Sequence, residues 1–314
     1  MTAPLVVHNV KVHFATPRGT VRALDGVSFS LDRGEIVGVV GESGCGKSTL
    51  AKTIVGLQRP SSGSVEIDGN DLLAASRRVV LQKRRQIQMV FQDPFGSLNP
   101  RLSIGRILSE PFIVHGLGTC LERQQWVSEL IEQVGLASDS LTRRPHEFSG
   151  GQRQRICIAR ALALKPSVIV CDEAVSALDV SVQAQILNLL LDLRKSADLS
   201  YVFISHDLSV IHYMSDRVMV MYLGEVVELA PADALWMSPY HPYAMRLLSA
   251  VDRRKTAALK SNNDEVPSQI NPPAGCPFHP RCPFAKNRCH TEKPMLRQIS
   301  DRRWAACHYA GDIG

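Results

Sequence analysis

Short apolar runs alternate with longer amphipathic stretches along much of the chain. The runs have the length of strands and lie at residues 5–14, 27–31, 35–40, 88–91, 168–171 and 201–204. The amphipathic stretches at 47–57 and 180–194 have the pattern of helices. Strands that alternate with helices in this way predict an α/β fold built on a parallel sheet.

One long region departs from this alternation. Residues 103–165 lose the β-branched runs, and the apolar residues around Trp126 and Leu130 follow helical spacing. We therefore expect a helical subdomain, at about 97–165, inserted into the sheet-containing unit. The polar, proline-bearing segment 252–274 predicts a linker. The expected parts are a main unit at 1–235, a helix with this linker at 236–274, and a small cysteine-rich extension at 275–314.

The composition is that of a folded globular protein. Of the 314 residues, 45% are apolar and 21% are charged. No apolar stretch approaches the ~20 residues of a membrane-spanning helix. The N-terminal residues lack the pattern of a secretory signal, so we expect the chain to stay in the cytosol. The net charge of +6 is compatible with nucleotide phosphates or an anionic membrane surface and does not indicate nucleic-acid binding.

A glycine-rich motif separates the strand at 35–40 from the helix that follows. Residues 41–48 read GESGCGKS and match the phosphate-loop pattern G-x-x-x-x-G-K-[ST]. Glycines let successive backbone N–H groups turn toward phosphate oxygens, and the helix adds its N-terminal partial positive charge. In such a loop Lys47 reaches the β- and γ-phosphates, and Ser48 offers a hydroxyl to Mg²⁺. A flexible glycine turn is the alternative, but the strand before and the helix after favour a phosphate site.

Two acidic residues, Asp172 and Glu173, directly follow the apolar run at 168–171. Asp172 is placed to hold Mg²⁺ through water, and Glu173 to polarise a water for attack on a γ-phosphate. An acid pair after a strand also occurs in ordinary surface turns. The phosphate loop upstream in the same α/β unit favours the catalytic interpretation.

A second glycine-rich turn, SGGQ at 149–152, opens an amphipathic helix. It forms another potential anion site at a helix N-terminus. Taken alone, an ordinary N-cap turn is the better explanation of these residues.

Together the motifs resemble those of the nucleotide-binding subunit of an ABC transporter. In that comparison residues 41–48 resemble Walker A, 168–172 Walker B, and FSGGQ at 148–152 the ABC signature. Three shorter matches add to these: Gln92 at the Q-loop, SALD at 176–179 at the D-loop, and His206 at the switch histidine. The order and spacing of all six agree with the family.

The resemblance implies a site for ATP and Mg²⁺. The implied catalytic residues are Lys47, Gln92, Glu173 and His206, and the implied Mg²⁺ ligands are Ser48, Gln92 and Asp172. The implied nucleotide-binding residues are Phe14, Gly41, Ser43, Gly44, Cys45, Gly46, Lys47, Ser48, Thr49, Ser149, Gly150, Gly151, Gln152 and Asp179. In the family two such domains pair head to tail, so Ser149 and Gly151 would contact the γ-phosphate held by the partner. ATP closes that dimer and hydrolysis reopens it.

Further segments resemble the ATPase subunits of oligopeptide, dipeptide and nickel importers. They are FQDP at 91–94, VSALDVSVQAQ at 175–185, HPY at 241–243 and CPFHPRC at 276–282. The resemblance implies an ATPase that powers the import of peptides or a related small solute. It also implies a second ATPase subunit, with a heterodimer favoured, two transmembrane permeases, an extracytoplasmic solute-binding protein, and no nucleic acid. The chain would be peripheral, at the cytoplasmic face of the inner membrane.

Two other classes of function compete with this interpretation. One is a soluble ABC ATPase of translation or DNA repair; such proteins usually carry two ATPase domains or a long coiled coil before the signature. This chain has one phosphate loop and too short a segment for the coiled coil. The other is a redox- or metal-sensing nucleotide-binding module, against which the intact Glu173 and His206 argue.

Four of the eight cysteines, Cys276, Cys282, Cys289 and Cys307, crowd near the C-terminus. In a cytosolic protein such a group indicates metal or redox chemistry before structural disulfides. The short Cys-x-x-Cys pairs usual in zinc sites are absent. Four thiolates on loops suit a [4Fe–4S] cluster, and the resemblance to importer ATPases with this tail favours it. Zinc, and metal-free thiols or a disulfide, are the alternatives.

Overall fold

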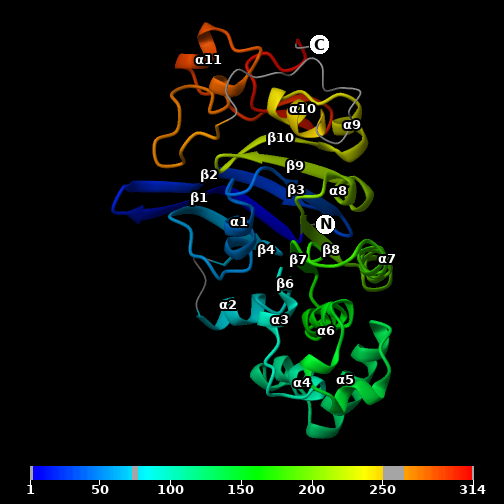
Figure 1. Ribbon diagram of the computed structural model, residues 1–314. Helices are drawn as coiled ribbons and strands as arrows, with labels where there is room; N and C mark the ends of the chain where they lie inside the picture. Colours follow the sequence, from blue (N-terminus) through cyan, green and yellow to red (C-terminus); the bar gives the residue numbers. More distant parts are fainter. Residues whose placement is uncertain (1–2, 73–76, 250–264, 313–314) are drawn as a thin grey trace.

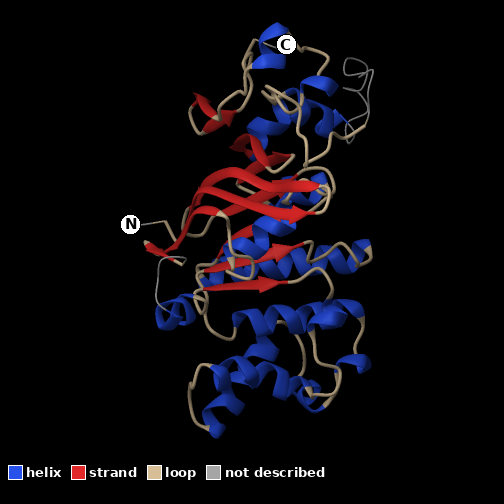
Figure 2. Ribbon diagram, turned by 90° about the vertical axis from the view of Figure 1, so that its left-hand side faces the viewer, coloured by secondary structure: helices blue, strands red, loops and turns tan. Residues whose placement is uncertain are grey.

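The molecule is arranged in three tiers. The computed structural model describes residues 3–72, 77–249 and 265–312. Figure 1 shows two β-sheets in the middle tier, with helices α4 (Ile104–Val114) and α5 (Cys120–Gln133) at one end. Helices α9 (Ala232–Met237), α10 (Pro242–Ser249) and α11 (Asn287–Thr291) lie at the other end. Figure 2, turned by 90°, shows the same succession of tiers.

The main sheet has eight strands in the order β11-β12-β10-β9-β3-β8-β7-β6. Its parallel part consists of β3 (Ile36–Val40), β6 (Ile87–Val90), β7 (Val168–Asp172), β8 (Ser200–Ile204) and β9 (Arg217–Tyr222). Every residue of β3, β7, β8 and β9 is buried, as expected for parallel strands covered on both faces. The predicted parallel sheet and its apolar strands are thereby confirmed.

Successive residues of β3 serve two different cores, because side chains alternate between the faces of a strand. Ile36 and Val40 join the core formed with α7 (Val180–Ala197) and α8 (Leu208–Met214). Val37 and Val39 join the core that includes α1 (Lys47–Ile54) and the second sheet. The strand that precedes the phosphate loop is therefore fixed from both sides.

The second sheet is antiparallel, in the order β2-β1-β4-β5. It contains β1 (Leu5–Thr16), β2 (Gly19–Leu31), β4 (Ser62–Ile67) and β5 (Asn70–Asp71). The prediction of a strand at 27–31 was too short, since β2 pairs with β1 from Gly19 onward. Its first four residues, Gly19 to Arg22, are exposed or half-buried, so this end of the strand lacks the apolar run that marks a buried strand.

Helices and turns alone occupy the region between β6 and β7, in agreement with the predicted helical insertion. After α2 (Arg77–Lys83) and β6 come α3 (Pro94–Ser97), α4, α5, two 3₁₀ turns (Ser138–Thr142 and Pro145–Glu147) and α6 (Gly150–Leu162). Thr119 and Glu122 form a capping box that starts α5, as their spacing favours.

The C-terminal segment joins the main sheet instead of forming a sheet of its own. Strand β12 (Arg303–Ala305) pairs with β10 (Glu225–Pro231), and β11 (Arg297–Ser300) pairs with β12. A short 3₁₀ turn, His279–Arg281, precedes α11. Of the predicted linker at 252–274, residues 252–264 lie outside the described residues.

None of the helices in the described ranges is long and apolar enough to cross a bilayer.

Candidate active site

The phosphate loop at 41–48 connects β3 to α1, and its glycines are required by close backbone approaches. A Cβ at Gly41 would lie 2.3 Å from the carbonyl oxygen of Met221. A Cβ at Gly46 would lie 2.3 Å from that of Ala23. Both glycines also have positive φ, 155° and 109°, which L side chains rarely adopt. The loop thus owes its curled shape to glycine, as the motif predicts.

The ammonium group of Lys47 lies against the loop itself. Its Nζ donates to the carbonyl oxygens of Gly41 at 2.7 Å and Glu42 at 3.0 Å. The side chain is buried, and Lys47 is the first residue of α1. Phosphate oxygens are the stronger acceptors, so a bound triphosphate would compete with these carbonyls for the ammonium.

Asp172 and Ser48 meet at the carboxyl end of the sheet. The Ser48 hydroxyl donates to Asp172 Oδ1 at 3.2 Å. Burial raises the pKa of Asp172, the charge of Glu173 adds to this, and the hydrogen bond from Ser48 opposes it. A hydroxyl beside a buried carboxylate offers the oxygen ligands that Mg²⁺ prefers.

Gln92 and His206 converge on the carboxylate of Glu173. Gln92 Nε2 donates to Glu173 Oε2 at 2.8 Å, and His206 Nδ1 lies 3.5 Å from the same oxygen. The three residues follow β6, β7 and β8, which are neighbours in the sheet, and carboxyl ends of adjacent parallel strands meet at one edge. Glu173 itself has a left-handed backbone with φ 49°. Such strain in a non-glycine residue is typical of functional positions.

These residues share one pocket of about 470 Å³. It is lined by Ala23, Ser43, Gly44, Gly46, Lys47, Ser48, Thr49, Gln92, Glu173, His206 and Gln269. The structure therefore gathers most of the predicted loop around a single cavity. All four implied catalytic residues, Lys47, Gln92, Glu173 and His206, line it. Cys45 is buried beneath the loop, and burial raises the pKa of its thiol.

Nothing in the sequence analysis indicated Gln269 as a site residue. Its side-chain amide donates to the carbonyl oxygen of Gly44 at 2.7 Å. Its backbone carbonyl accepts from the backbone N–H of Arg22 at 3.2 Å. A single polar residue in a predicted linker carries no local signal. Only the path of the chain after residue 264 brings it to the phosphate loop.

Two predicted contacts within the loop, Gly41 and Cys45, and six predicted contacts from elsewhere in the chain do not line this pocket. Ser149 caps α6, accepting from the N–H of Gln152 at 3.4 Å, and Gly151 packs so closely that an added Cβ would lie 2.3 Å from Val182. Asp179 caps α7. Phe14 is 38% exposed on β1, opposite Val21. Their roles as nucleotide contacts stay predictions. The six residues are Phe14, Ser149, Gly150, Gly151, Gln152 and Asp179.

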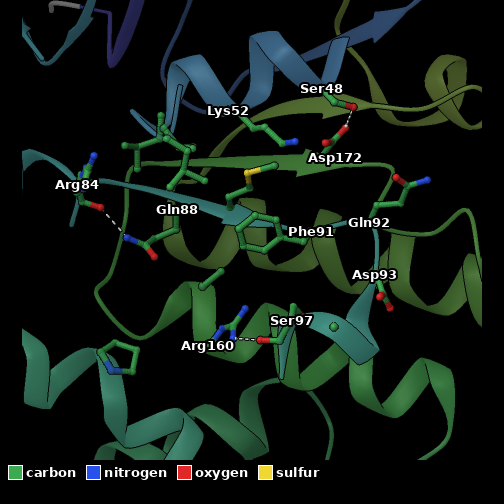
Figure 3. Close-up of a pocket in the computed structure, with 17 residues that line it drawn as sticks. Ser48, Lys52, Arg84, Gln88, Phe91, Gln92, Asp93, Ser97, Arg160 and Asp172 are labelled. Atoms are coloured by element: carbon green, nitrogen blue, oxygen red, sulfur yellow. Dashed lines mark hydrogen bonds between the residues drawn. The ribbon is translucent and has the colours of Figure 1, made fainter. Parts of the chain in front are cut away.

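A second pocket of about 720 Å³ adjoins the first and extends toward the helical region. Ser48 and Gln92 line both pockets. Figure 3 shows Ser48 and Asp172 at the α1 side of this groove, and Ser97 and Arg160 at the opposite side. Gln92 thus forms a shared wall between the candidate active site and an open groove.

The four C-terminal cysteines surround one small cavity of about 10 Å³. Burial raises the pKa of Cys276 to about 12 and that of Cys282 to about 11, and the other thiols of the group add to both shifts. All four thiols are free. Within the described ranges, no set of three or more histidine, cysteine or acidic side chains is arranged as a metal site.

The comparisons with known proteins agree with this geometry. The family model "ABC transporter" matches residues 24–176, and the model "Oligopeptide/dipeptide transporter, C-terminal region" matches residues 227–289. The chain also resembles the ATP-binding cassette MJ0796, solved as a dimer bound to ADP and Pi. The TM-score is 0.66 at 30% identity, covering 73% of this chain and 98% of that one.

Curated relatives match over nearly the whole chain. Di/tripeptide transport ATP-binding protein DppF of Pseudomonas aeruginosa is 47% identical over 99% of this chain and 98% of its own length. Oligopeptide transport ATP-binding protein AppF of Bacillus subtilis is 50% identical over 92% of this chain and 90% of its own length. With its phosphate loop, Glu173 and Q-loop glutamine around one pocket, and Asp172 hydrogen-bonded to Ser48 of that loop, the chain belongs to the family of ABC transporter ATP-binding proteins.

Proposed function

We propose that the chain is the ATP-hydrolysing subunit of a peptide importer. The observation that carries this proposal is the convergence of Gln92 and His206 on Glu173 beside Lys47, in a chain whose curated relatives are named for peptide transport. The relatives do not favour a translation, DNA-repair or sensing role. The chain would act at the cytoplasmic face of the inner membrane as a peripheral subunit.

The residues of the pocket divide the chemistry of hydrolysis between them. Lys47 and the N–H groups of the loop bind the β- and γ-phosphates. Ser48, Gln92 and Asp172 would hold Mg²⁺, which neutralises phosphate charge when bound. Glu173 accepts a proton from water while the water oxygen bonds to the γ-phosphorus and the bond to the ADP oxygen breaks. His206 and Gln92 hold the Glu173 carboxylate in place.

A second ATPase subunit would complete the site. Ser149 and Gly151 lie outside the pocket of their own chain, at the N-terminus of a 13-residue helix. A helix N-terminus attracts anions, so in a head-to-tail pair this end would face the γ-phosphate held by the other subunit. We favour a heterodimer, together with two permeases and a solute-binding protein.

The groove beside Gln92 is the proposed docking site for a permease. It is lined by apolar residues such as Met89 and Phe91 and by the cations Lys52, Arg84 and Arg160. Phe95 of α3 lies next to it, 63% exposed, with the Arg153 guanidinium 3.8 Å from its ring centroid. A movement of a permease helix bound in this groove would be transmitted to Glu173 through Gln92. Gln92 lines both pockets and donates a hydrogen bond to Glu173.

The proposal is tested on the complex reconstituted in vesicles with its permeases and binding protein. A photo-reactive amino acid at Phe95 is expected to crosslink to a permease, and crosslinking should stop ATP-dependent uptake of a labelled short peptide. The matched control is the same label at Leu121, an apolar residue that is 78% exposed on α5, a helix that contributes no residue to the lining of the groove. Permease captured at Leu121 and absent at Phe95 would contradict this docking site, and a complex without peptide uptake would contradict the importer.

We further propose that Cys276, Cys282, Cys289 and Cys307 hold a [4Fe–4S] cluster. All four thiols line one cavity, and such clusters take four cysteine ligands. The raised pKa values of Cys276 and Cys282 mean that these thiols lose their protons only with a cation to balance the charge. The cavity is small, so the surrounding loops would have to open to admit the cluster. When bound, the cluster would tie the C-terminal loops together.

Anaerobic purification of the complex should yield about four iron and four sulfide per chain if this is correct. Replacing Cys289 with serine should remove the iron, whereas replacing Cys120, an exposed cysteine of α5, should not. One zinc per chain would support the zinc alternative. Anaerobically purified, folded protein that contains neither metal nor sulfide would contradict the cluster and support metal-free thiols.

A further inference from the structure

The second residue of the phosphate loop, Glu42, carries a negative charge beside the place where a triphosphate binds. An unpaired carboxylate there would repel the phosphates, because like charges at short range disfavour each other. The structure pairs this charge. Arg281, from the C-terminal segment, donates from Nη1 to Glu42 Oε2 and from Nη2 to Glu42 Oε1, each at 2.8 Å.

Arg281 is built into the molecule to make this contact. Its side chain is 3% exposed, and Nη1 also lies 3.4 Å from the hydroxyl of Tyr222. Its guanidinium lies near the rings of Tyr222 and Phe278, with centroids at 5.7 and 5.9 Å. The hydrogen bonds that Arg281 donates to Glu42 raise the pKa of Arg281 further, so it stays charged. A two-bond pair of this kind fixes geometry as well as charge.

The C-terminal part also holds the backbone of Glu42. The N–H of Glu42 donates to the hydroxyl of Tyr243 on α10 at 2.8 Å. The carbonyl of Glu42 accepts from Lys47 Nζ at 3.0 Å. Glu42 therefore connects two residues from beyond position 240 directly to the lysine of the active site.

We propose that Arg281 is a positioning residue of the ATP site: it neutralises Glu42 and, through it, holds the phosphate loop in the shape that receives a triphosphate. Arg281 touches neither the pocket nor the reacting atoms, so it acts on ATP affinity and not on the chemical step. The inference uses the ATP site of the proposed function and is independent of what the four cysteines bind.

The test measures the affinity of the assembled complex for a fluorescent ATP analogue, together with KM and kcat for ATP. Arg281→Met is expected to weaken binding about tenfold and to raise KM similarly, with a smaller change in kcat. Two effects contribute: the loop is no longer held, and the Glu42 charge is left unpaired. Arg281→Lys should recover part of the affinity, because it restores the charge without the second hydrogen bond.

The sign of a second change distinguishes this role from a merely structural one. Glu42→Gln should weaken binding in the normal chain, where it breaks the pair. In the Arg281→Met background the same change should strengthen binding, since it removes the unpaired charge. A further loss in that background, or unchanged affinity in Arg281→Met, would overturn the proposal.

The chain offers a matched control in another buried pair. Arg217 donates to Glu35 from Nε at 2.6 Å and from Nη2 at 2.9 Å, and both side chains are under 10% exposed, at 8% and 7%. Neither residue lines the nucleotide pocket. Arg217→Met should lower the melting temperature and leave ATP affinity unchanged; if it weakens ATP binding as much as Arg281→Met, the loss reflects general destabilisation. If the complex with the unsubstituted chain binds no ATP, that result would instead contradict the proposed function.

Discussion

Replacing Glu173 with glutamine is expected to lower kcat for ATP hydrolysis by about 10²–10⁴-fold while leaving ATP affinity nearly unchanged. Glutamine keeps the size of the side chain but accepts no proton from the attacking water. Gln92 and His206 would still surround the position, so the pocket should keep its shape. Because closure follows binding and reopening follows hydrolysis, the variant should accumulate as an ATP-bound dimer with its partner ATPase.

Single-turnover hydrolysis and size analysis with and without ATP measure these two effects. Glu66→Gln, a change of the same kind on β4 outside the pocket, serves as the control and should behave as the normal chain does. If Glu173→Gln hydrolyses ATP at the normal rate, another group removes the proton. If the pair fails to associate with ATP, the head-to-tail arrangement is wrong.

Removing the ammonium of Lys47 is expected to have a comparable effect on turnover and a larger one on binding. Lys47→Ala leaves the charge that develops on the γ-phosphoryl group without its nearest cation, and we expect a loss of about 10²-fold or more in kcat. ATP binding should weaken as well, since Lys47 is a buried residue that lines the pocket at the N-terminus of α1. Steady-state ATPase assays and equilibrium titration separate the two contributions.

Two further variants sharpen this result. Lys47→Arg keeps the charge but replaces a compact point charge with a wide planar group, and it should restore little activity in so close a loop. Lys195→Ala removes an exposed lysine at the end of α7 and should change neither kcat nor affinity. Retained steady-state turnover in Lys47→Ala would show that the phosphate site has been assigned to the wrong loop.

The phosphate loop was predictable because its chemistry is local. Its glycines, Lys47 and Ser48 stand within eight consecutive residues, and the strand before and helix after are visible as apolar patterns. The same holds for the pairing of Asp172 and Glu173, which are neighbours in the chain. For β2 the pattern failed at the first four residues of the strand, which are exposed or half-buried and where pairing with β1, not burial, decides the structure.

Before the structure was available, the proximity of Gln92, Glu173 and His206 could be expected only from the family resemblance, because no spacing along the chain indicates it. Gln92 and Glu173 are separated by 81 positions, and the adjacency of β6, β7 and β8 brings them together. Local sequence patterns were therefore sufficient to predict the contiguous phosphate loop, the acidic pair and the α/β class, because short-range geometry and periodic burial leave a local signal.

The distant residues that contact that loop are set by the folding of the whole chain. Gln269 reaches Gly44 from 225 positions away, and Arg281 reaches Glu42 from 239. Gln269 lies in no motif, and the segment 276–282 that contains Arg281 carries a family resemblance without indicating the partner of this arginine. The pairing of β12 with β10 attaches the C-terminal segment to the edge of the main sheet. Gln269 and Arg281 then contact the phosphate loop from this segment. Contacts of this kind depend on packing across the whole molecule, which no local pattern specifies.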